Sequence, residues 1–464
     1  MVKRLIGCVV IVALSGNSFF INAQQFKQFS GKSEKFTSEI NLFLGSTIEP
    51  DLKKIVHDFE VNWDSLIFSV REKENILLFS RCFIEKKGRA NPDFYNFLNT
   101  LNLFLVKGHP RESFGQWLNS LIGICNNPKT SILIINRLIG NTSDLLAKNV
   151  IYKSPSIIWK PTSKNYVYKF DSILHLVFEN TDLVCYSRHD SIKITGTSGE
   201  VLPTKLHWNG RKGKITWERA GYSSDSVSAS LTNYNIDLTK SSYEADSVSF
   251  TYKAYFSSPL FGHFEDNVTL IKKPSLATYP EFDSYKKQFI IRNLYPNVNY
   301  EGGFSMQGAK LVGKGSIEKP ARLDFYRKDT LRLKAASQFF IFRPERIIGT
   351  DAMVSIYLDR DSIYHGDVQF IYTTKNKEIS LVKSENYTAQ SPYLDSYHKV
   401  DMNFEQLRWR IDEPIILIST NPGSSIGKAS FESINFFILF SRYLISSFVS
   451  ILFDLMMLKE IQKI

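Results

Sequence analysis

The pattern of apolar and polar positions divides the chain into two parts, and the first part is helical. Between residues 45 and 148 the apolar residues recur with a period of about 3.6 residues, that of an α-helix. This period predicts consecutive amphipathic helices with short connections. Pro50 suits the first turn of one helix, Asn91-Pro92 opens another, and Asn126-Asn127-Pro128 ends a third. The apolar faces are carried by Leu52, Ile55, Val56, Phe59, Phe94, Phe97, Leu98, Leu101, Leu105, Phe114, Trp117, Leu118, Leu121 and Ile122. We expect these faces to form the core of a small helical bundle or array.

After Pro155 the apolar period changes to two, which is typical of strands with one buried face. The aromatic content of 14% also favours strands, because flat rings pack well on a pleated surface. The alternation is clearest at Tyr166, Tyr168, Phe170, Leu174, Leu176, Phe178, Ile192, Ile194, Val248, Phe250 and Tyr252. A meander is predicted from Val354 to Leu381, with turns at Asp359-Arg360-Asp361 and Lys375-Asn376.

A short phrase of Asp, then Ser or Thr, then an apolar residue recurs at the expected strand starts. Asp and Ser side chains bond their own backbone in turns, so we interpret the phrase as turn chemistry and not as catalysis. Six copies after Pro155, each with an aliphatic third residue, begin at Asp171, Asp190, Asp225, Asp246, Asp329 and Asp361.

These patterns predict an α+β fold by segregation, with mostly antiparallel β modules of sandwich-like or open-sheet type and a C-terminal apolar helix. At 464 residues the chain exceeds one ordinary core. The expected segments are a signal peptide (1–23), a helical domain (24–150), a first β-rich module (151–272), a second β-rich module (273–433) and an apolar helix or tail (434–464). The boundary between the β modules is expected near residues 271–300, where prolines interrupt the alternation.

The first residues have the layout of a cleavable secretory signal. Lys3 and Arg4 precede an apolar run from Leu5 to Leu14, and small or polar residues lead to Ala23. The run is shorter than the roughly 20 residues that a membrane span needs, so we expect cleavage after Ala23. Lipidation at Cys8 is the rival interpretation, but there the apolar run follows the cysteine instead of preceding it.

The positive charge is spread along the chain. The formal net charge of +11 becomes +9 when cleavage of the signal peptide removes Lys3 and Arg4. Because no dense Lys/Arg block or basic helix occurs, we do not expect nucleic-acid binding. Envelope polysaccharide, lipid head groups and other envelope proteins are the expected partners, and no cofactor is predicted.

Three cysteines remain after the signal, namely Cys82, Cys125 and Cys185. An odd, sparse set is not a disulfide framework. Cys125 follows Leu121 by one helical turn on an apolar face, which favours a buried, unreactive thiol. A single bridge between Cys82 and Cys125 is the alternative.

Two local motifs near the C-terminus resemble catalytic signatures without meeting their requirements. Gly423 to Gly427 has the spacing of a serine-hydrolase elbow, but no histidine follows His398. The same glycines are one residue too close for a phosphate loop, and Ala429 stands where a Ser or Thr is needed. Neither activity is expected. The nearest acid–base pairs, His189 with Asp190 and His263 with Glu265, lack a third group and are interpreted as solvated residues.

One segment is a candidate anion-binding turn, although no catalytic or metal-binding residue is predicted. Asn-Gly between apolar runs favours a hairpin turn, and the amides and cations around it could hold an anion. The candidate residues are Asn209, Gly210, Arg211, Lys212, Gly213 and Lys214.

The C-terminal tail is almost wholly apolar from Phe436 to Leu458 and is broken by Arg442 and Asp454. It is long enough to span a membrane, and the two charges lie toward its ends, where they cost less. A membrane anchor through residues 436–458, a buried or surface-lying helix, and an out-of-frame end of a truncated chain are the three interpretations.

Three segments, Trp208–Glu218, Ser258–Val268 and Asn299–Gly315, carry glycine-aromatic phrases. With the helical part they resemble the opening portion of long exported β-rich proteins of Gram-negative bacteria that have no assigned activity, over roughly residues 24–433. The resemblance transfers no active site. It implies that relatives continue past residue 433 in β structure.

The sequence therefore predicts an exported cell-envelope protein, periplasmic or at the cell surface, with a noncatalytic binding or scaffold role. The alternative is a hydrolase, for example a carbohydrate-active one, with a site assembled from distant residues. A deep cleft with two carboxylates about 5–10 Å apart would favour the hydrolase, and a shallow aromatic face would favour binding.

Overall fold

The computed structural model describes residues 26, 28–45, 49–65, 67–188, 190–343, 345–383, 390–419 and 429–434. Helices come first and an antiparallel sheet follows, which confirms the α+β class. The chain forms two compact units, one of residues up to Val106 with Leu118–Asn136, the other of Lys107–Trp117 with the residues from Arg137 onward. The expected signal peptide and the expected helix at 436–458 lie outside the described residues. Within the described ranges, no helix is long and apolar enough to cross a membrane.

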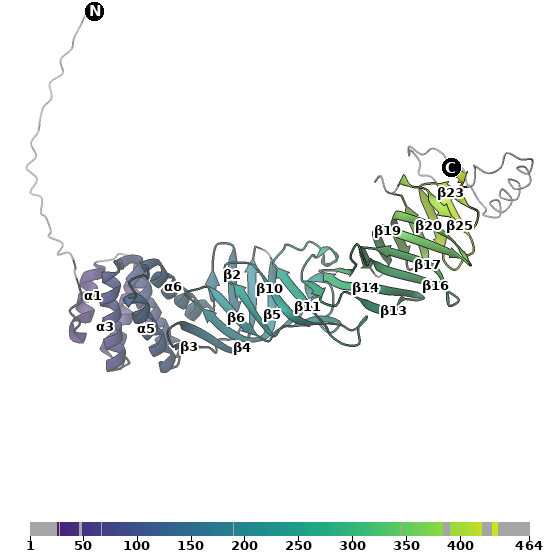
Figure 1. Ribbon diagram of the computed structural model, residues 1–464. Helices are drawn as coiled ribbons and strands as arrows, with labels where there is room; N and C mark the ends of the chain where they lie inside the picture. Colours follow the sequence, from purple (N-terminus) through teal and green to yellow (C-terminus); the bar gives the residue numbers. More distant parts are fainter. Residues whose placement is uncertain are drawn as a thin grey trace, which may run out of the picture. The chain divides into compact units, whose positions relative to one another are not determined.

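The predicted helices at Pro50, after Asn91-Pro92 and around Trp117 are confirmed as α2, η2 with α4, and α5. Pro50 occupies the first turn of α2. A capping box begins α3, because the Ser69 hydroxyl accepts the Glu72 amide while the Glu72 carboxylate accepts the Ser69 amide. Figure 1 shows the helices in chain order. Their bounds are η1 Ser33–Lys35, α1 Phe36–Leu44, α2 Pro50–Asp64, α3 Val70–Glu85, η2 Ala90–Phe94, α4 Tyr95–Val106, α5 Arg111–Asn126 and α6 Ile132–Lys148.

The core of the helical unit is built largely from phenylalanine. Phe36, Phe59 and Phe83 are fully buried, and their rings pack edge-on or tilted against neighbouring aromatic rings. The other rings of this cluster are Phe26, Phe29, Phe43, Trp63, Phe68, Phe79, Phe94 and Phe97. The aromatic content of the chain is therefore not only a strand signal, since much of it fills a helical core.

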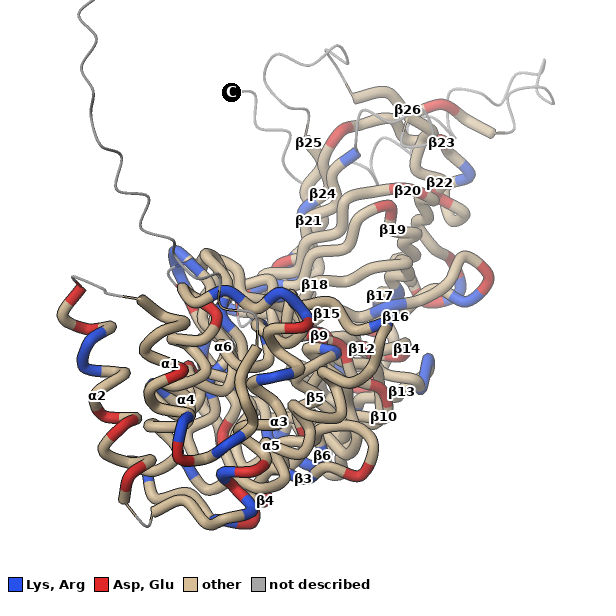
Figure 2. The backbone as a smooth tube through the Cα atoms, turned by 90° about the vertical axis from the view of Figure 1, so that its left-hand side faces the viewer, with Lys and Arg blue, Asp and Glu red and all other residues tan. Residues whose placement is uncertain are grey.

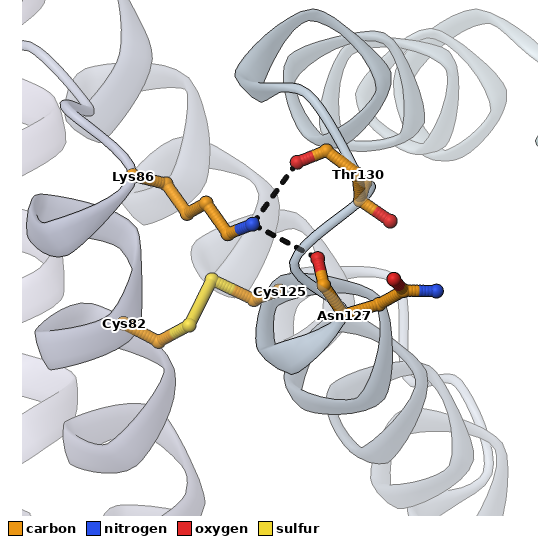
Figure 3. The surroundings of a disulfide bond; sticks show 5 residues. All are labelled: Cys82, Lys86, Cys125, Asn127 and Thr130. Atoms are coloured by element: carbon orange, nitrogen blue, oxygen red, sulfur yellow. Dashed lines mark hydrogen bonds between the residues drawn. A yellow bond between two sulfur atoms is a disulfide. The ribbon is translucent and has the colours of Figure 1, made fainter.

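A disulfide joins Cys82 of α3 to Cys125 of α5, with the two Cα atoms 6.2 Å apart (Figure 3). The expectation of a free Cys125 thiol is wrong, and the alternative bridge is the one that the structure contains. Beside it, the Lys86 ammonium donates to the carbonyls of Asn127 at 2.9 Å and Thr130 at 3.1 Å. The bridge and these two hydrogen bonds together fix the end of α3 against the end of α5.

The strands of the second unit pair in antiparallel fashion and follow largely in chain order (Figure 1). The predicted meander is confirmed as β19, β20 and β21. The strands are β1 Tyr152–Lys153, β2 Ile157–Pro161, β3 Val167–Phe170, β4 Leu174–Ser187, β5 Asp190–Leu202, β6 His207–Arg211, β7 Lys214–Thr216, β8 Val227–Ser230, β9 Asn233–Asp237, β10 Ser242–Tyr252, β11 Leu260–Asn267, β12 Glu281–Ser284, β13 Phe289–Tyr295, β14 Val298–Gln307, β15 Lys310–Lys314, β16 Ala321–Arg327, β17 Thr330–Ser337, β18 Phe339–Arg343, β19 Arg346–Leu358, β20 Asp361–Thr373, β21 Glu378–Val382, β22 Tyr393–Asp395, β23 Val400–Asn403, β24 Gln406–Arg410, β25 Ile416–Ser419 and β26 Ser430–Ser433, with short 3₁₀ turns η3 Glu218–Ala220 and η4 Pro274–Leu276.

Long strands in this unit change partners where their register shifts. Residues 174–177 of β4 pair with β3, and residues 183–187 pair with β2 on the far side of an irregularity. β19 likewise pairs with β18 before its register shift and with β17 after it. Bulges of this kind bend a strand, so one strand serves two ladders. Pairing runs from β11 through β12 to β14, so the boundary expected near residues 271–300 does not coincide with a break in the sheet.

The Asp phrase starts strands at five of its six copies. Those at Asp171, Asp190, Asp225, Asp329 and Asp361 lie at or just before the first residue of β4, β5, β8, β17 and β20. The copy at Asp246 is a correction, because it lies inside β10 at a register shift where Ser247 has a φ of 55°. There the same turn chemistry produces a bulge instead of a strand start.

Aromatic rings lie over strand glycines. A Cβ on Gly210 would overlap the ring of Tyr234, its partner in the β6–β9 ladder. A Cβ on Gly262 would overlap the ring of Phe282 on the neighbouring strand β12. This packing is the physical reason for the glycine-aromatic phrases, since the missing side chain makes room for a ring from another strand.

Candidate anion-binding site

A pocket of about 590 Å³ lies in the second unit where the end of α6 meets β2, β4 and the residues before α5. We call it the lysine pocket. Its polar walls come from Lys107, His109, Lys148, Asn149, Lys160, Thr162, Lys164, Tyr166 and Tyr186. Neither aspartate nor glutamate is among its fourteen lining residues. The pocket is therefore positively charged, and its charge comes from residues that are far apart in the sequence.

The lysines are available for a ligand. Lys148 lies 3.5 Å from the Asp144 carboxylate one helical turn earlier, and both side chains are partly exposed. Within the described part of the chain, Lys107, Lys160 and Lys164 form no ion pair. Charges of both signs are interspersed along the backbone (Figure 2), and the lysines of the pocket come from residues 107, 148, 160 and 164 and not from one basic block.

Asn149 fixes one wall of the pocket. It ends α6 with a φ of 57°, in the left-handed conformation that asparagine tolerates. Its side-chain amide donates to the carbonyls of Pro161 at 2.6 Å and Ser163 at 3.2 Å. The helix end is thereby tied to the segment that follows β2 and carries Thr162 and Lys164.

A second wall is formed by the contact between His109 and Tyr166. The Tyr166 hydroxyl lies 3.3 Å from Nε2 of His109, and the ring centroids are 5.0 Å apart. Burial lowers the pKa of His109, so this ring is neutral near pH 7. Burial also raises the pKa of Tyr166, which keeps its hydroxyl protonated. Near pH 7 the positive charge of the pocket therefore comes from its lysines alone.

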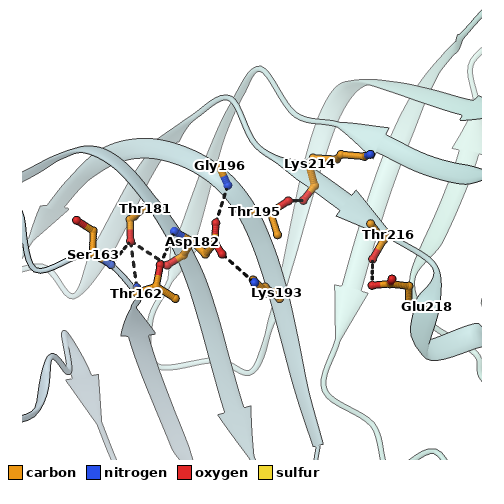
Figure 4. Close-up of polar contacts among 10 residues, drawn as sticks. All are labelled: Thr162, Ser163, Thr181, Asp182, Lys193, Thr195, Gly196, Lys214, Thr216 and Glu218. Atoms are coloured by element: carbon orange, nitrogen blue, oxygen red, sulfur yellow. Dashed lines mark hydrogen bonds and ion pairs between the residues drawn. The ribbon is translucent and has the colours of Figure 1, made fainter. Parts of the chain in front are cut away.

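Hydrogen bonds at the bulge of β4 hold the turn beside the pocket (Figure 4). The Thr181 hydroxyl accepts the amides of Thr162 and Ser163, both at 3.1 Å, and the Thr162 hydroxyl accepts the Asp182 amide at 3.0 Å. Asp182 also pairs with Lys193 at 2.8 Å. Burial works to raise the pKa of Asp182, but Lys193 and the Gly196 amide outweigh it and lower the pKa.

The candidate segment Asn209–Lys214 has a different structure from the one expected. Asn209 and Gly210 lie inside β6 and pair with both β5 and β9, so the predicted hairpin turn there is wrong. The backbone turns instead at Lys212 and Gly213, whose φ values are 59° and 139°. After this turn β7 continues along the same edge of β5.

The backbone of this segment contributes little to an anion site. The Lys212 amide already donates to the Thr232 carbonyl at 2.7 Å, and the Asn209 side chain donates to Glu200 at 3.3 Å. The side chains of Arg211, Lys212 and Lys214 are exposed. Any anion held here would therefore meet cationic side chains and not a nest of free amides.

The histidine–acid pairs do not form a catalytic set in the structure. His263 shares a face with Glu265, but its Nδ1 lies 3.0 Å from Asp246, and Glu265 accepts a hydrogen bond from the Tyr279 hydroxyl at 3.3 Å. His189 lies outside the described residues. Among the residues that the structure describes, no cluster of His, Cys, Asp and Glu has the geometry to hold a metal ion.

A row of acids crosses the sheet near His263. Glu244, Glu265 and Glu281 stand directly opposite one another on β10, β11 and β12. Burial, and then the charge of Glu265, raise the pKa of Glu281. The row lies on an exposed or half-exposed sheet face.

Arg219 binds two carboxylates in the interior. Its guanidinium donates to Asp266 at 2.9 Å and to Asp190 at 3.2 Å. Burial raises the pKa of Asp266 to about 7, the attraction of Arg219 opposes this rise, and the charge of Asp190 adds to it. Asp266 is 2% exposed and the other two side chains are partly exposed, and the cluster joins η3, β5 and β11.

Comparison with protein-family models, with curated proteins and with solved structures finds no match for this chain. The lysines of the pocket form no local block of charge, so the charge pattern of the sequence does not predict the pocket. The available signal was the strand alternation around Trp159, which places Lys160 on the face opposite the core.

Proposed function

We propose that the chain is an exported cell-envelope protein that binds anionic envelope components through the lysine pocket, without converting them. The observation that carries this proposal is a pocket of about 590 Å³ with four lysines and no carboxylate in its lining. Lysine is a mobile point charge that suits phosphate and carboxylate groups. Asn149, Thr162 and Tyr186 add polar and aromatic surface, so the pocket suits an anion attached to a larger polar molecule.

Two observations support export. The first residues have the layout of a secretory signal. The Cys82–Cys125 disulfide is of the kind found in proteins of oxidising compartments such as the periplasm. The resemblance to long exported β-rich proteins of Gram-negative bacteria agrees with this address, which we also propose.

Export is tested by expressing the full chain in a Gram-negative host and measuring the intact mass of the protein in each cell fraction. We expect a species that begins at Gln24, with Cys82 and Cys125 oxidised and Cys185 reduced. Carbonate extraction then separates a membrane-anchored tail from a soluble one. An uncleaved, fully reduced chain in the cytoplasm would refute export.

Binding is tested with galacturonate and glucose 6-phosphate, and with galactose as the uncharged comparison. A triple Gln variant of Lys148, Lys160 and Lys164 should lose about tenfold or more in affinity, because it removes three exposed charge pairs that are worth up to about 1 kcal/mol each. The matched control replaces Lys272, Lys319 and Lys375, which are exposed and form no ion pair within the described ranges. Equal binding by both variants would refute the site.

The hydrolase alternative is favoured by one observation, the opposed pair Glu265 and Glu281. Neighbouring carboxyl groups, one with a raised pKa, are the pattern of acid and nucleophile in retaining glycosidases. Their exposed face argues against this activity, because such chemistry uses an enclosed cleft. Release of reducing sugar from envelope polysaccharide, abolished by Glu265→Gln or Glu281→Gln, would establish the alternative.

A further inference from the structure

The lysine pocket continues onto the outer face of the sheet. Lys160 of β2 lies opposite Val184 of β4, which in turn lies opposite Lys193 of β5. The residues beside them in each strand, Trp159, Cys185 and Ile192, are buried. Lys160 and Lys193 therefore lie on the face opposite Trp159, and Val184 between them is 7% exposed and lines the lysine pocket.

Lys214, the last residue of the segment singled out in the sequence, lies on the same face. It stands opposite Thr195, two residues beyond Lys193 along β5, and is exposed. Figure 4 shows Thr162, Lys193, Thr195 and Lys214 following one another across neighbouring strands. With strands about 4.8 Å apart, Lys193 lies roughly 10 Å and Lys214 roughly 14 Å from Lys160 across the sheet.

Among the described residues, the lysines of this row that lack an ion-pair partner lie toward its two ends, and the lysine between them is paired. Lys160 and Lys214 have no ion-pair partner among the residues that the structure describes. Two acids lie on the row: Asp182 pairs with Lys193 at 2.8 Å and accepts the Gly196 amide at 2.9 Å, and Glu218 lies at the far end. Glu218 accepts a hydrogen bond from the Thr216 hydroxyl at 3.1 Å. Asp182 therefore neutralises Lys193, and Glu218 lies at the end of the row beyond Lys214.

We propose that the lysine pocket is one end of a binding track over Lys160, Lys193 and Lys214, and that its ligand is an anionic polysaccharide laid across β2, β4, β5 and β7. This inference rests on the proposed function. A single phosphate or lipid head group fits in the pocket and cannot also reach Lys214. A chain with repeated carboxylate or phosphate groups spans both, and Thr195, Ser230 and the exposed Tyr186 ring offer contacts for sugar hydroxyls and faces.

The test compares galacturonate monomer with galacturonate dodecamer in ligand-observed NMR titrations of the full chain. Lys160→Gln should weaken both ligands about two- to fivefold, because Lys160 lines the pocket that both ligands enter. Lys214→Gln should leave the monomer unchanged and weaken the dodecamer about two- to fivefold, as expected for one exposed charge pair. Lys375→Gln, an exposed lysine at the β20–β21 turn, should change neither.

The outcomes separate the track from the pocket. If the monomer binds and Lys214→Gln has no effect on the dodecamer, the track is refuted and the proposed function stands. If vesicles containing anionic lipid bind and compete with the monomer while the dodecamer does not bind, the ligand is a head group and the polysaccharide is refuted. If no anionic probe binds, the proposed function itself fails.

Discussion

The disulfide between Cys82 and Cys125 should supply a large share of the stability of the helical unit. The bridge closes a loop with a sequence separation of 43 residues. On the chain-entropy account, closing a loop of this length stabilises the folded unit by about 4 kcal/mol. The perturbation is the double substitution Cys82→Ala and Cys125→Ala, and the matched control is Cys185→Ala, which removes a buried cysteine that is not bonded.

Hydrogen exchange of the full chain, followed by mass spectrometry, measures the loss where it occurs. A change of 4 kcal/mol corresponds to nearly a thousandfold faster exchange for amides that open with the unit. We expect this acceleration in peptides from α3 and α4, and no comparable change in β19 and β20. The reasoning is refuted if α3 and α4 exchange within a few-fold of the wild type, or if Cys185→Ala produces the same acceleration.

Three further predictions concern the second unit. Asn149→Asp replaces a donor to two carbonyls with a carboxylate that cannot donate, so denaturant unfolding should show a loss of about 1–3 kcal/mol. Asn149→Gly also removes the donor but suits the φ of 57°, so its loss should be smaller, and wild-type stability of Asn149→Asp would contradict the role of these bonds. Gly262→Ala places a methyl group against the Asp283 carbonyl oxygen and the Phe282 ring and should lower stability by about 1–3 kcal/mol or more, and an unchanged melting temperature would contradict this packing. The folded pKa of Asp266, about 7, lies above its usual 3.8, so the folded state retains a proton that the unfolded state has lost. Stability should therefore fall as pH rises from about 4 to about 7, and urea unfolding of Asp266→Asn should lack this dependence.

The sequence was sufficient for elements whose signal is local. The helices at Pro50 and before Asn126, and the alternating strands around Phe250, were predicted because their apolar faces repeat within a few residues. The Asp phrase predicted five strand starts correctly for the same reason. It failed at Asp246, where pairing with β11 continues past the phrase and turns it into a bulge.

Features that depend on distant residues were not predictable in this way. Asn209-Gly210 has the sequence of a hairpin turn, but the ring of Tyr234 fills the space at Gly210 and keeps the pair in a strand. The lysine pocket draws Lys107 from before α5 and Lys160 from β2, so no sequence window contains it. The disulfide likewise required knowing that α3 lies beside α5.

On the proposal above, the lysine pocket is where anionic polysaccharide binds the protein. The most direct measurement is zero-length carbodiimide cross-linking of galacturonate oligomers to the full chain, followed by peptide mapping, because it joins a ligand carboxylate only to an amine that it contacts. With labelled oligomers, we predict that the labelled amides form mainly at Lys107, Lys148, Lys160 and Lys164, with further ones at Lys193 and Lys214 along the track, and that they disappear with excess unlabelled oligomer. Cross-links spread equally over exposed lysines outside the pocket, such as Lys272 and Lys375, would contradict the account.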